Sequence, residues 1–319
     1  MYVILDKIKL FDPVIGINEK RSIIKVLESK FWASGSGSGN VLKFEENFRK
    51  YIDSDGCVAV NSGTAALNLS LSLIDVKNYE VILPSLSFVS TANAIILNGG
   101  KPVFVDINPN TLNMDSEKIE NYISKKTKAI MPVHIYGLMC DMPAIMDLAS
   151  KYHLYIVEDS GQCYLGKNNK GQLAGTIGHV GSWSFENSKQ LTCGDGGMIS
   201  CNSKELATTI RKIGGLGFNS LTAESGKVRT DRDKLQNPNW SRFDEIGYNY
   251  RMNQMAAAVA LAQMERAEYF IDLRRSMGLA YTEVLSNSNL LTSQHVLEGY
   301  YHTYYTFSAK FNGEKLGVS

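Results

Sequence analysis

Short runs of β-branched and aliphatic residues alternate with longer amphipathic segments along the chain up to about residue 205. The apolar runs predict strands at 58–60, 81–83, 103–105, 129–133 and 154–157, and a further apolar run covers 180–185. The amphipathic segments predict helices at 65–71, 88–97, 115–123 and 141–152. Such alternation is typical of βαβ units. It predicts an α/β fold with a mainly parallel sheet covered by helices on both faces.

The rest of the chain departs from this alternation. Residues 219–245 are polar, densely charged and contain Pro238, so we interpret them as a long excursion, either a lid or an oligomer arm. Residues 252–273 are rich in Ala, Met, Leu and Glu and predict one long helix that links two domains. A smaller α+β portion begins near residue 290, and the chain ends only one strand into it. We therefore expect a large domain with its N-terminal segment over 1–250, and a linking helix with a partial small domain over 251–319.

Composition excludes several classes of protein. The 319 residues carry a formal net charge of +1, which favours neither nucleic acid nor an anionic membrane surface. We see no apolar run long enough to span a bilayer and no signal-peptide pattern. Five cysteines without a CxxC spacing indicate free thiols and a reducing cytoplasm, and no close cysteine or histidine pairs suggest a metal site.

The most informative chemistry surrounds Lys189. An apolar run leads into it, and the small residues Cys193 to Gly197 follow it. Thirty positions earlier Asp159 ends another apolar strand. A solvated surface charge is the usual interpretation of a lysine taken alone. A carboxylate at a strand end followed by a lysine in a Gly/Ser-rich turn is instead what pyridoxal phosphate (PLP) requires. The lysine forms the Schiff base, and the carboxylate keeps the pyridine nitrogen protonated.

Other polar residues fall where they can join this site. Parallel strands in α/β sheets place their sites beyond the carboxyl ends, and several residues lie near such ends: Asn61, Ser85, His134, Asp159 and Ser184. The segment 61–64 opens a helix, so its N–H groups predict either a plain cap or an anion site for a phosphate, to which Ser184 could donate. Phe88 is either a core residue or the ring that stacks on the cofactor. The glycine-serine run 34–39 resembles a linker, but we prefer a binding loop.

Seven stretches in order make the chain resemble the DegT/DnrJ/EryC1/StrS sugar aminotransferases, which have the aspartate aminotransferase fold. Their order and coverage of about residues 10–310 make the resemblance specific. The matching stretches are 61–67, 102–107, 132–137, 158–162, 184–185 with Lys189, 194–198 and 247–252.

The resemblance implies roles for single residues. Lys189 would hold PLP as the internal aldimine and shuttle the proton, while Asp159 would pair with the pyridine nitrogen. Phe88 would stack on the ring, and Gln162 would contact its other side or O3′. The phosphate would be held by Ser62, Gly63, Thr64 and Ser184, with Asn249 reaching across a homodimer interface to the partner's cofactor. The residues implied near the amino donor or the sugar are Trp32, Ser34, His134 and His302.

The implied reaction is a ping-pong transamination. An amino acid, most often glutamate in this family, would aminate the cofactor, which would then aminate a keto group on a nucleotide-linked deoxysugar. A glutamine-dependent aminocyclitol aminotransferase and a catalytically silent sugar-binding homologue remain alternatives. A 3-dehydratase relative would have histidine in place of Lys189, so the lysine argues against that activity.

Overall fold

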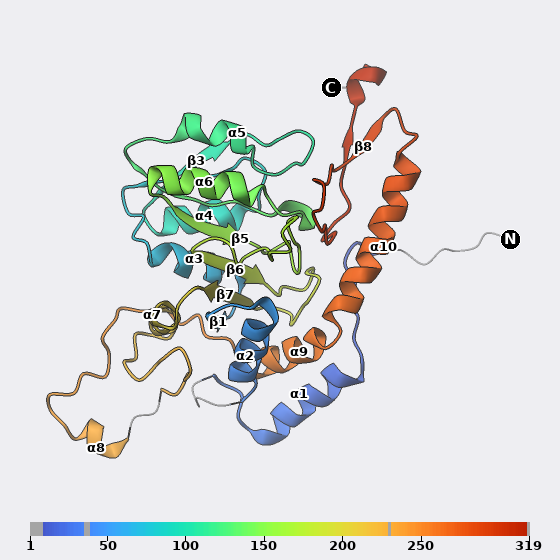
Figure 1. The fold of residues 1–319 in the computed structure, drawn as a ribbon. Helices are drawn as coiled ribbons and strands as arrows, with labels where there is room; N and C mark the ends of the chain where they lie inside the picture. The colour runs from blue at the N-terminus through green and yellow to red at the C-terminus, as the bar shows by residue number, and fades with distance from the viewer. Residues whose placement is uncertain (1–8, 35–38, 229–230, 318–319) are drawn as a thin grey trace.

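A seven-stranded sheet forms the centre of the molecule in the computed structural model, which describes residues 9–34, 39–228 and 231–317 (Figure 1). The strand order is β1-β7-β6-β5-β4-β2-β3. β7 runs antiparallel to both of its neighbours, and the other pairings are parallel. The strands are β1 (Gly56–Val60), β2 (Glu80–Pro84), β3 (Lys101–Val105), β4 (Thr127–Ile130), β5 (Tyr155–Asp159), β6 (Val180–Ser184) and β7 (Gly197–Cys201).

Helices cover both faces of this sheet. On one face lie α3 (Gly63–Ser72), α4 (Val89–Leu97) and α7 (Lys204–Gly214), which pack their apolar side chains on the strands. The other face is covered by α2 (Asn40–Ile52), α5 (Ser116–Ile119), α6 (Met142–Tyr152) and α9 (Gln254–Met264). α1 (Ile17–Ser29) packs outside α9. Short 3-10 turns lie at Glu120–Tyr122, Ile135–Gly137 and Gly313–Leu316.

The predicted α/β fold and the mainly parallel sheet are confirmed. The predicted strands and helices up to residue 157 agree in type with the observed ones, although the helix predicted at 115–123 divides into α5 and a 3-10 turn, and the strand at 129–133 ends at Ile130. Strands such as β5 are buried over nearly their whole length, which explains why their sequences read as continuous apolar runs.

The single linking helix predicted over 252–273 is wrong. The segment forms α9 and a second helix, α10 (Ala267–Leu285), separated at Glu265 and Arg266. Arg266 leaves the helical conformation, with φ −120° and ψ 15°, and its guanidinium forms an ion pair with Glu19 of α1. This contact joins residues 247 positions apart, so local helix propensity could not reveal it.

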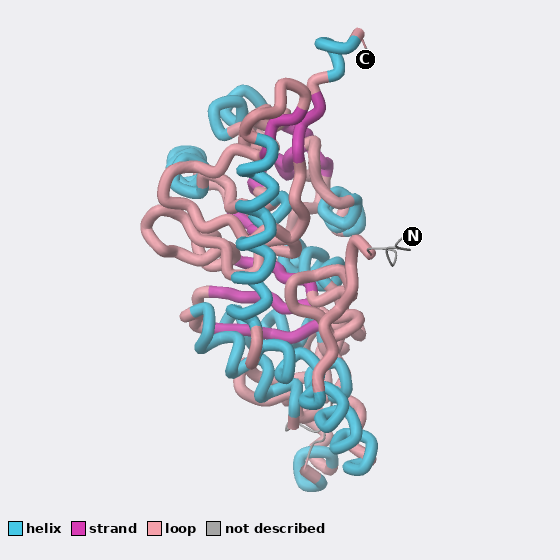
Figure 2. Tube along the Cα trace, turned by 90° about the vertical axis from the view of Figure 1, so that its right-hand side faces the viewer, coloured by secondary structure: helices cyan, strands magenta, loops and turns pink. Residues whose placement is uncertain are grey.

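α10 leads past the side of the sheet to which the parallel strands point, toward the hairpin of β8 (Leu291–Ser293) and β9 (Ala309–Phe311) (Figures 1 and 2). The division into domains at residue 250 stays a prediction. Among the described helices, none combines the length and apolar composition that a bilayer crossing requires.

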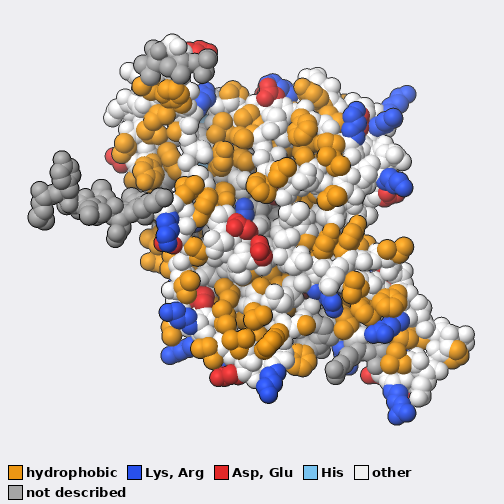
Figure 3. Space-filling view, turned by 180° about the vertical axis from the view of Figure 1, so that it is seen from behind, with side chains coloured by type: hydrophobic (Ala, Val, Ile, Leu, Met, Phe, Trp, Pro, Cys, Tyr) orange, Lys and Arg blue, Asp and Glu red, His pale blue; other side chains and the backbone are white. Residues whose placement is uncertain are grey.

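The excursion predicted at 219–245 is present as an arm, which we define as residues 218–228 and 231–243. It projects from the body beside α7 and carries the short helix α8 (Arg232–Leu235) (Figures 1 and 3). Phe218 and Phe243 close its base through an antiparallel bridge and a ring contact with centroids 4.8 Å apart. Many arm residues are exposed.

Candidate active site

The carboxyl ends of β5 and β6 bring the first two predicted site residues together. The strands pair in parallel, with Asp159 opposite Ser182, so Asp159 and Ser184 end neighbouring strands on the same side. A Cβ added to Gly161 would lie 3.1 Å from Oδ1 of Asp159 and 3.5 Å from Cβ of Ser184. The turn after β5 therefore lies between these two side chains.

The N-terminus of α3 meets the same region. Gly63 approaches Ser184 so closely that a Cβ on the glycine would lie 2.6 Å from Cβ and 2.9 Å from Oγ of Ser184. The first amides of a helix have no acceptor inside it, and the helix dipole adds positive potential there. Thr64 Oγ1 lies 2.8 Å from Oγ of Ser90, at the start of α4. Three hydroxyls and the helix amides thus gather in one small cradle that suits a phosphate.

Ser62 has a different role from the one the resemblance implied. Its hydroxyl oxygen accepts a hydrogen bond from the Ala65 amide at 3.1 Å, so the side chain is the N-cap of α3. The cap orders the first turn of the helix, and Ser62 supports the cradle through this contact.

Asp159 is a buried carboxylate with a donor on each oxygen. Its exposed fraction is 8%. Thr91 Oγ1 donates to Oδ2 at 2.8 Å, and the Gly161 amide donates to Oδ1 at 3.1 Å. Each carboxylate oxygen has two lone pairs, so capacity remains for a further donor such as a pyridinium nitrogen.

Phe88 directly precedes α4, in the same turn of chain that supplies Ser90 and Thr91. Its side chain is 63% exposed, which is unusual for a large aromatic residue. A core role is therefore wrong, and the ring is available for stacking.

Gln162 is oriented by a backbone contact. Its Oε1 accepts a hydrogen bond from the Tyr136 amide at 2.9 Å. Because this atom accepts from an N–H group, it must be the oxygen of the side-chain amide. The NH₂ group of Gln162 therefore points away from Tyr136. Tyr136 itself has φ 57°, a left-handed conformation that costs energy in a non-glycine residue. Gln162 can thus donate, and a phenolate-like oxygen such as O3′ of PLP is a suitable acceptor.

Lys189 lies at a cleft of about 750 Å³ between the large body and the C-terminal segment. Its Nζ is 4.5 Å from the centroid of the Tyr305 ring, within the range of a cation–π contact. Oγ of the neighbouring Ser188 lies 2.8 Å from the Tyr305 hydroxyl. The cleft is also lined by residues 9–14, by α10 residues including Arg274, and by residues 304–307.

The turn that carries Lys189 is joined to the strand end that carries Asp159. Nε2 of Gln190 donates to the Gln162 carbonyl at 2.9 Å. The Lys189 and Cys193 amides donate back into the same turn, to the carbonyls of Glu186 and Phe185. Lysine, carboxylate and phosphate cradle therefore belong to adjoining segments at one end of the sheet.

His134 lies inside the fold, and its contact with substrate stays a prediction. It is fully buried, and its Nε2 lies 2.9 Å from Oε2 of the equally buried Glu158. The Cys140 amide donates to its Nδ1 at 3.1 Å, so the proton must be on Nε2. Both ring nitrogens are engaged inside the fold.

His302 is likewise internal, with an exposed fraction of 2%. Its Nδ1 accepts from the Tyr304 amide at 3.0 Å, and its Nε2 lies 3.0 Å from Oε1 of Gln294. Burial and the nearby Arg275 lower the pKa of His302 to about 3, so the ring is neutral at ordinary pH. Its contact with substrate stays a prediction, and the ring offers substrate almost no exposed surface.

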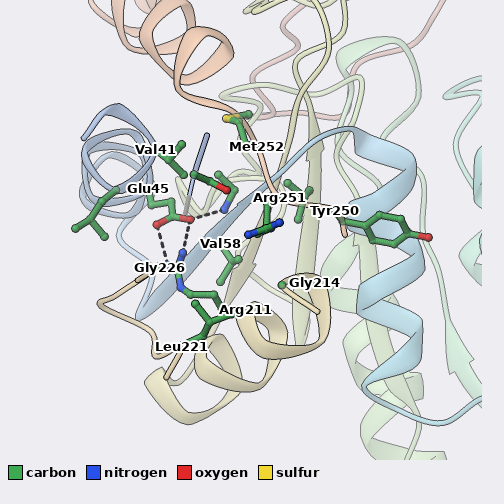
Figure 4. Close-up of a pocket in the computed structure, with 15 residues that line it drawn as sticks. Val41, Glu45, Val58, Arg211, Gly214, Leu221, Gly226, Tyr250, Arg251 and Met252 are labelled. Carbon is green, nitrogen blue, oxygen red and sulfur yellow. Dashed lines mark hydrogen bonds and ion pairs between the residues drawn. The ribbon is translucent and has the colours of Figure 1, made fainter. Parts of the chain in front are cut away.

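Trp32 and Ser34 do not reach the cleft of Lys189 in this chain. Ser34 lines a different cavity, built around a buried ion pair between Glu45 and Arg211 (Figure 4). Trp32 is held near α1 and α9, where its carbonyl accepts a hydrogen bond from the Gln254 amide at 2.8 Å. Residues 35–38 of the predicted binding loop lie outside the described residues.

Asn249 also lies away from Lys189. Its side chain is exposed, and its Oδ1 accepts from Nε of Arg251 at 3.0 Å. The next residue, Tyr250, accepts through its carbonyl from the Asn61 amide at 2.7 Å, so this segment runs beside the start of the phosphate cradle. Asn249 does not cap the helix that follows, because Asn253 is the N-cap of α9.

The residues at this end of the sheet fit PLP. An aldehyde requires an amine, which Lys189 supplies beside an open cleft. A phosphate requires N–H and O–H donors, which the cradle supplies, and a pyridinium requires a carboxylate with free acceptor capacity, which Asp159 supplies.

Comparison with known proteins agrees with the geometry. The model of the DegT/DnrJ/EryC1/StrS aminotransferase family matches residues 13–315. The chain belongs to this family. It is therefore an enzyme of the PLP-dependent aminotransferase class, and pyridoxal phosphate is its cofactor.

Similar members of the DegT/DnrJ/EryC1/StrS family act on nucleotide-linked sugars. The chain is 32% identical to a GDP-perosamine synthase of Caulobacter vibrioides over 99% of its own length and 80% of the relative's. It is 34% identical to dTDP-4-dehydro-2,3,6-trideoxy-D-glucose 4-aminotransferase of Saccharopolyspora spinosa, over 88% of this chain and 71% of that protein. Among solved structures, the aminotransferase TlmJ of Streptoalloteichus hindustanus has a TM-score of 0.85 at 30% identity, covering 97% of this chain and 80% of that one.

Three residues near the candidate site were not predicted from the sequence: Ser90, Thr91 and Tyr305. Ser90 and Thr91 follow Phe88 in the first turn of α4, where a helix start presents consecutive side chains to one end of the sheet. That signal was present in the sequence. No sequence signal links Tyr305 to Lys189, because the contact spans more than a hundred residues.

Proposed function

We propose that this enzyme transfers an amino group from glutamate to a keto group of a nucleotide-linked deoxysugar by a ping-pong mechanism. The observation that carries the proposal is that the segments with Lys189, Asp159 and the α3 cradle adjoin at one end of the sheet, and that Lys189 lines a cleft of about 750 Å³. The relatives' names support the substrate class.

Each group has a distinct role in the proposed reaction. When bound, PLP supplies an electron sink that stabilises negative charge at the carbon losing its proton. Lys189 holds the cofactor through Nζ and, when released, moves a proton as general acid and base. Asp159 keeps the ring nitrogen charged. Gln162 donates to the ring oxygen, and Phe88 covers one ring face.

We also propose that the active unit is a homodimer with shared sites. Next to the exposed Asn249, Ile246 is 98% exposed and Tyr248 is 40% exposed. Exposed apolar side chains in one segment are typical of a surface covered in an assembly. In such a dimer Asn249 would donate to the partner's cofactor phosphate. Trp32 and Ser34 would line the partner's cleft, near the amino donor or the sugar.

Reductive trapping tests the role of Lys189. Borohydride treatment of the PLP-loaded enzyme followed by peptide mapping should place the pyridoxyl group on Lys189. Lys189→Ala should abolish both the trapping and turnover. Lys167→Ala is the matched control, because Lys167 also lies over a tyrosine ring, 5.9 Å from the centroid of Tyr301, but outside this cleft. A Lys189→Ala enzyme that still transaminates at the wild-type rate would contradict the assignment.

Asp159→Asn tests the role of the carboxylate. At saturating PLP the variant should still hold the cofactor, because the phosphate cradle is separate from the ring nitrogen, but it should lose most of its activity. Cofactor content by absorbance and single-turnover rates with an amino donor measure the two effects separately. A fully active variant would remove Asp159 from the proposed site.

Donor and acceptor are tested in separate half-reactions. Mixing the PLP form with glutamate should bleach its visible absorbance, and keto-sugar nucleotides should then restore it. If glutamine bleaches the enzyme and glutamate does not, the aminocyclitol alternative replaces this proposal. If no amino acid bleaches it, the chain is a silent homologue.

A subunit-mixing experiment tests the shared site. Losing one hydrogen bond from Asn249 to a charged phosphate, worth about 1.5–3 kcal/mol, should weaken PLP retention about tenfold or more. Lys189→Ala and Asn249→Ala subunits are then combined under exchange conditions. Hybrid dimers would have both lesions in one site and an intact second site, so part of the activity should return. Proven exchange without recovery contradicts the shared site.

A further inference from the structure

Thr91 is buried at the end of the sheet with its hydroxyl on the carboxylate of Asp159. The Oγ1–Oδ2 distance is 2.8 Å, and Thr91 has no exposed surface. The two residues lie 68 positions apart in the sequence, on α4 and on β5. A hydroxyl can donate only one proton, so Thr91 gives its proton to this carboxylate.

The donors on Asp159 define how its carboxylate is turned. Thr91 binds Oδ2, and the Gly161 amide binds Oδ1 at 3.1 Å. With one donor on each oxygen, rotation of the carboxylate about χ2 would break both bonds.

The first turn of α4 links this contact to the rest of the site. Phe88, Ser90 and Thr91 are nearly consecutive, and the Thr91 amide donates to the Phe88 carbonyl at 3.0 Å. Ser90 contacts Thr64 of the cradle. The first turn of α4 therefore sets the distances between the exposed Phe88 ring, the hydroxyls of the phosphate cradle and the Asp159 carboxylate.

We propose that Thr91 is a positioning residue for the cofactor ring. It acts through Asp159, holding the carboxylate aimed at the ring nitrogen. This inference rests on the proposed role of Asp159. If Thr91 has this role, the effect of replacing it on cofactor affinity depends on whether the bound ring contains the nitrogen. A purely structural contact would affect both kinds of ring equally.

The experiment measures cofactor affinity with two ligands. One is PLP, and the other is its analogue with C–H in place of the ring nitrogen, which cannot pair with Asp159. Thr91→Val removes the hydroxyl at nearly constant shape. It should weaken PLP binding tenfold or more, since a hydrogen bond to a charged group is worth at least about one decade in affinity. The analogue should bind the variant and the wild type equally.

Control variants separate positioning from folding. Thr91→Ser keeps the hydroxyl and should restore PLP binding to within about threefold, an order-of-magnitude allowance for the lost methyl group. Ser70→Ala removes another fully buried hydroxyl, which is bonded to a helix carbonyl at 2.8 Å, and should leave both affinities unchanged. If Thr91→Val is unstable, Thr91→Ala gives the same comparison, because only the difference between the two ligands is interpreted.

Each outcome decides the inference. Equal losses for PLP and the analogue, or no loss for PLP, would overturn the role of Thr91. Asp159→Asn serves as the reference: it must discriminate between the two ligands if Asp159 pairs with the ring nitrogen. If Asp159→Asn weakens the binding of PLP more than that of the analogue and Thr91→Val does not, the positioning role of Thr91 is wrong, while the proposed function stands. If Asp159→Asn does not discriminate, the proposed role of Asp159 fails first.

Discussion

The substitution Glu158→Gln tests whether His134 belongs to a structural network. The carboxylate of Glu158 is fully buried behind Asp159 and accepts four hydrogen bonds. Oε1 accepts from the amides of Ile177 at 2.7 Å and Gly178 at 2.5 Å. Oε2 accepts from the Gly175 amide at 2.8 Å and from Nε2 of His134 at 2.9 Å.

The magnitude follows from counting acceptors. Glutamine has the same shape as glutamate, but one of its two terminal atoms is an NH₂ group that cannot accept. Whichever way the amide turns, two of the four donors lose their acceptor and face another donor. Each buried donor left without a partner costs about 1–3 kcal/mol. We therefore expect the free energy of unfolding to fall by about 3–5 kcal/mol, a large part of the stability of an ordinary domain.

Urea unfolding followed by circular dichroism measures this change, provided that the slope with denaturant stays constant. Glu120→Gln is the matched control. Glu120 accepts from Lys151 at 2.6 Å, but its side chain is 45% exposed, so its replacement should destabilise the fold far less than Glu158→Gln does. The companion His134→Gln should also destabilise the fold, because the Cys140 amide and Glu158 would both need new partners.

A destabilisation of Glu158→Gln below about 1 kcal/mol would refute this reasoning, since the count of lost acceptors sets a higher minimum. A His134→Gln enzyme that keeps wild-type stability but has a raised KM for either substrate would support the predicted contact of His134 with substrate.

Three further perturbations follow from the same structure. Arg211→Met should cost about 3–5 kcal/mol in urea unfolding, because it leaves Glu45 buried without its partner at 2.7 Å, and adding Glu45→Leu should recover part of the loss. The pKa of His302 is lowered to about 3 in the folded chain. Between about pH 3 and about pH 6.5 the unfolded chain therefore binds a proton that the folded chain does not. Stability should fall with falling pH, by about 2 kcal/mol between pH 6.5 and 5, and His302→Asn should flatten that slope. Gly63→Ala should weaken PLP binding in equilibrium dialysis, because its Cβ would lie 2.6 Å from Cβ of Ser184, and Ser184→Gly in the same chain should relieve the clash; unchanged binding in Gly63→Ala would show that the cradle is not the phosphate site.

The sequence determined the order and type of most elements of this fold. β-Branched runs and amphipathic periodicity report local burial, and those signals predicted the strands and helices up to β5. The same sequence placed Asp159 and Ser184 at strand ends. Because parallel strands end on one side of a sheet, this was enough to predict that they lie together.

The tertiary structure decided which polar residues are free to act. His134 and His302 have the residue type of a substrate contact, but partners inside the fold engage both ring nitrogens of each. Phe88 has the residue type of a core residue, yet 63% of it is exposed. Burial and hydrogen-bond partners at long sequence separation cannot be read from local pattern.

The same physics explains the break between α9 and α10 and the contact of Thr91 with Asp159. Helix propensity acts over one or two turns, whereas the ion pair of Arg266 with Glu19 spans 247 residues and the Thr91 bond spans 68. Local hydrogen bonds and side-chain periodicity determined the elements. The packing of distant elements then determined which side chains face a cleft, because each polar group must find its partner wherever the folded chain provides one.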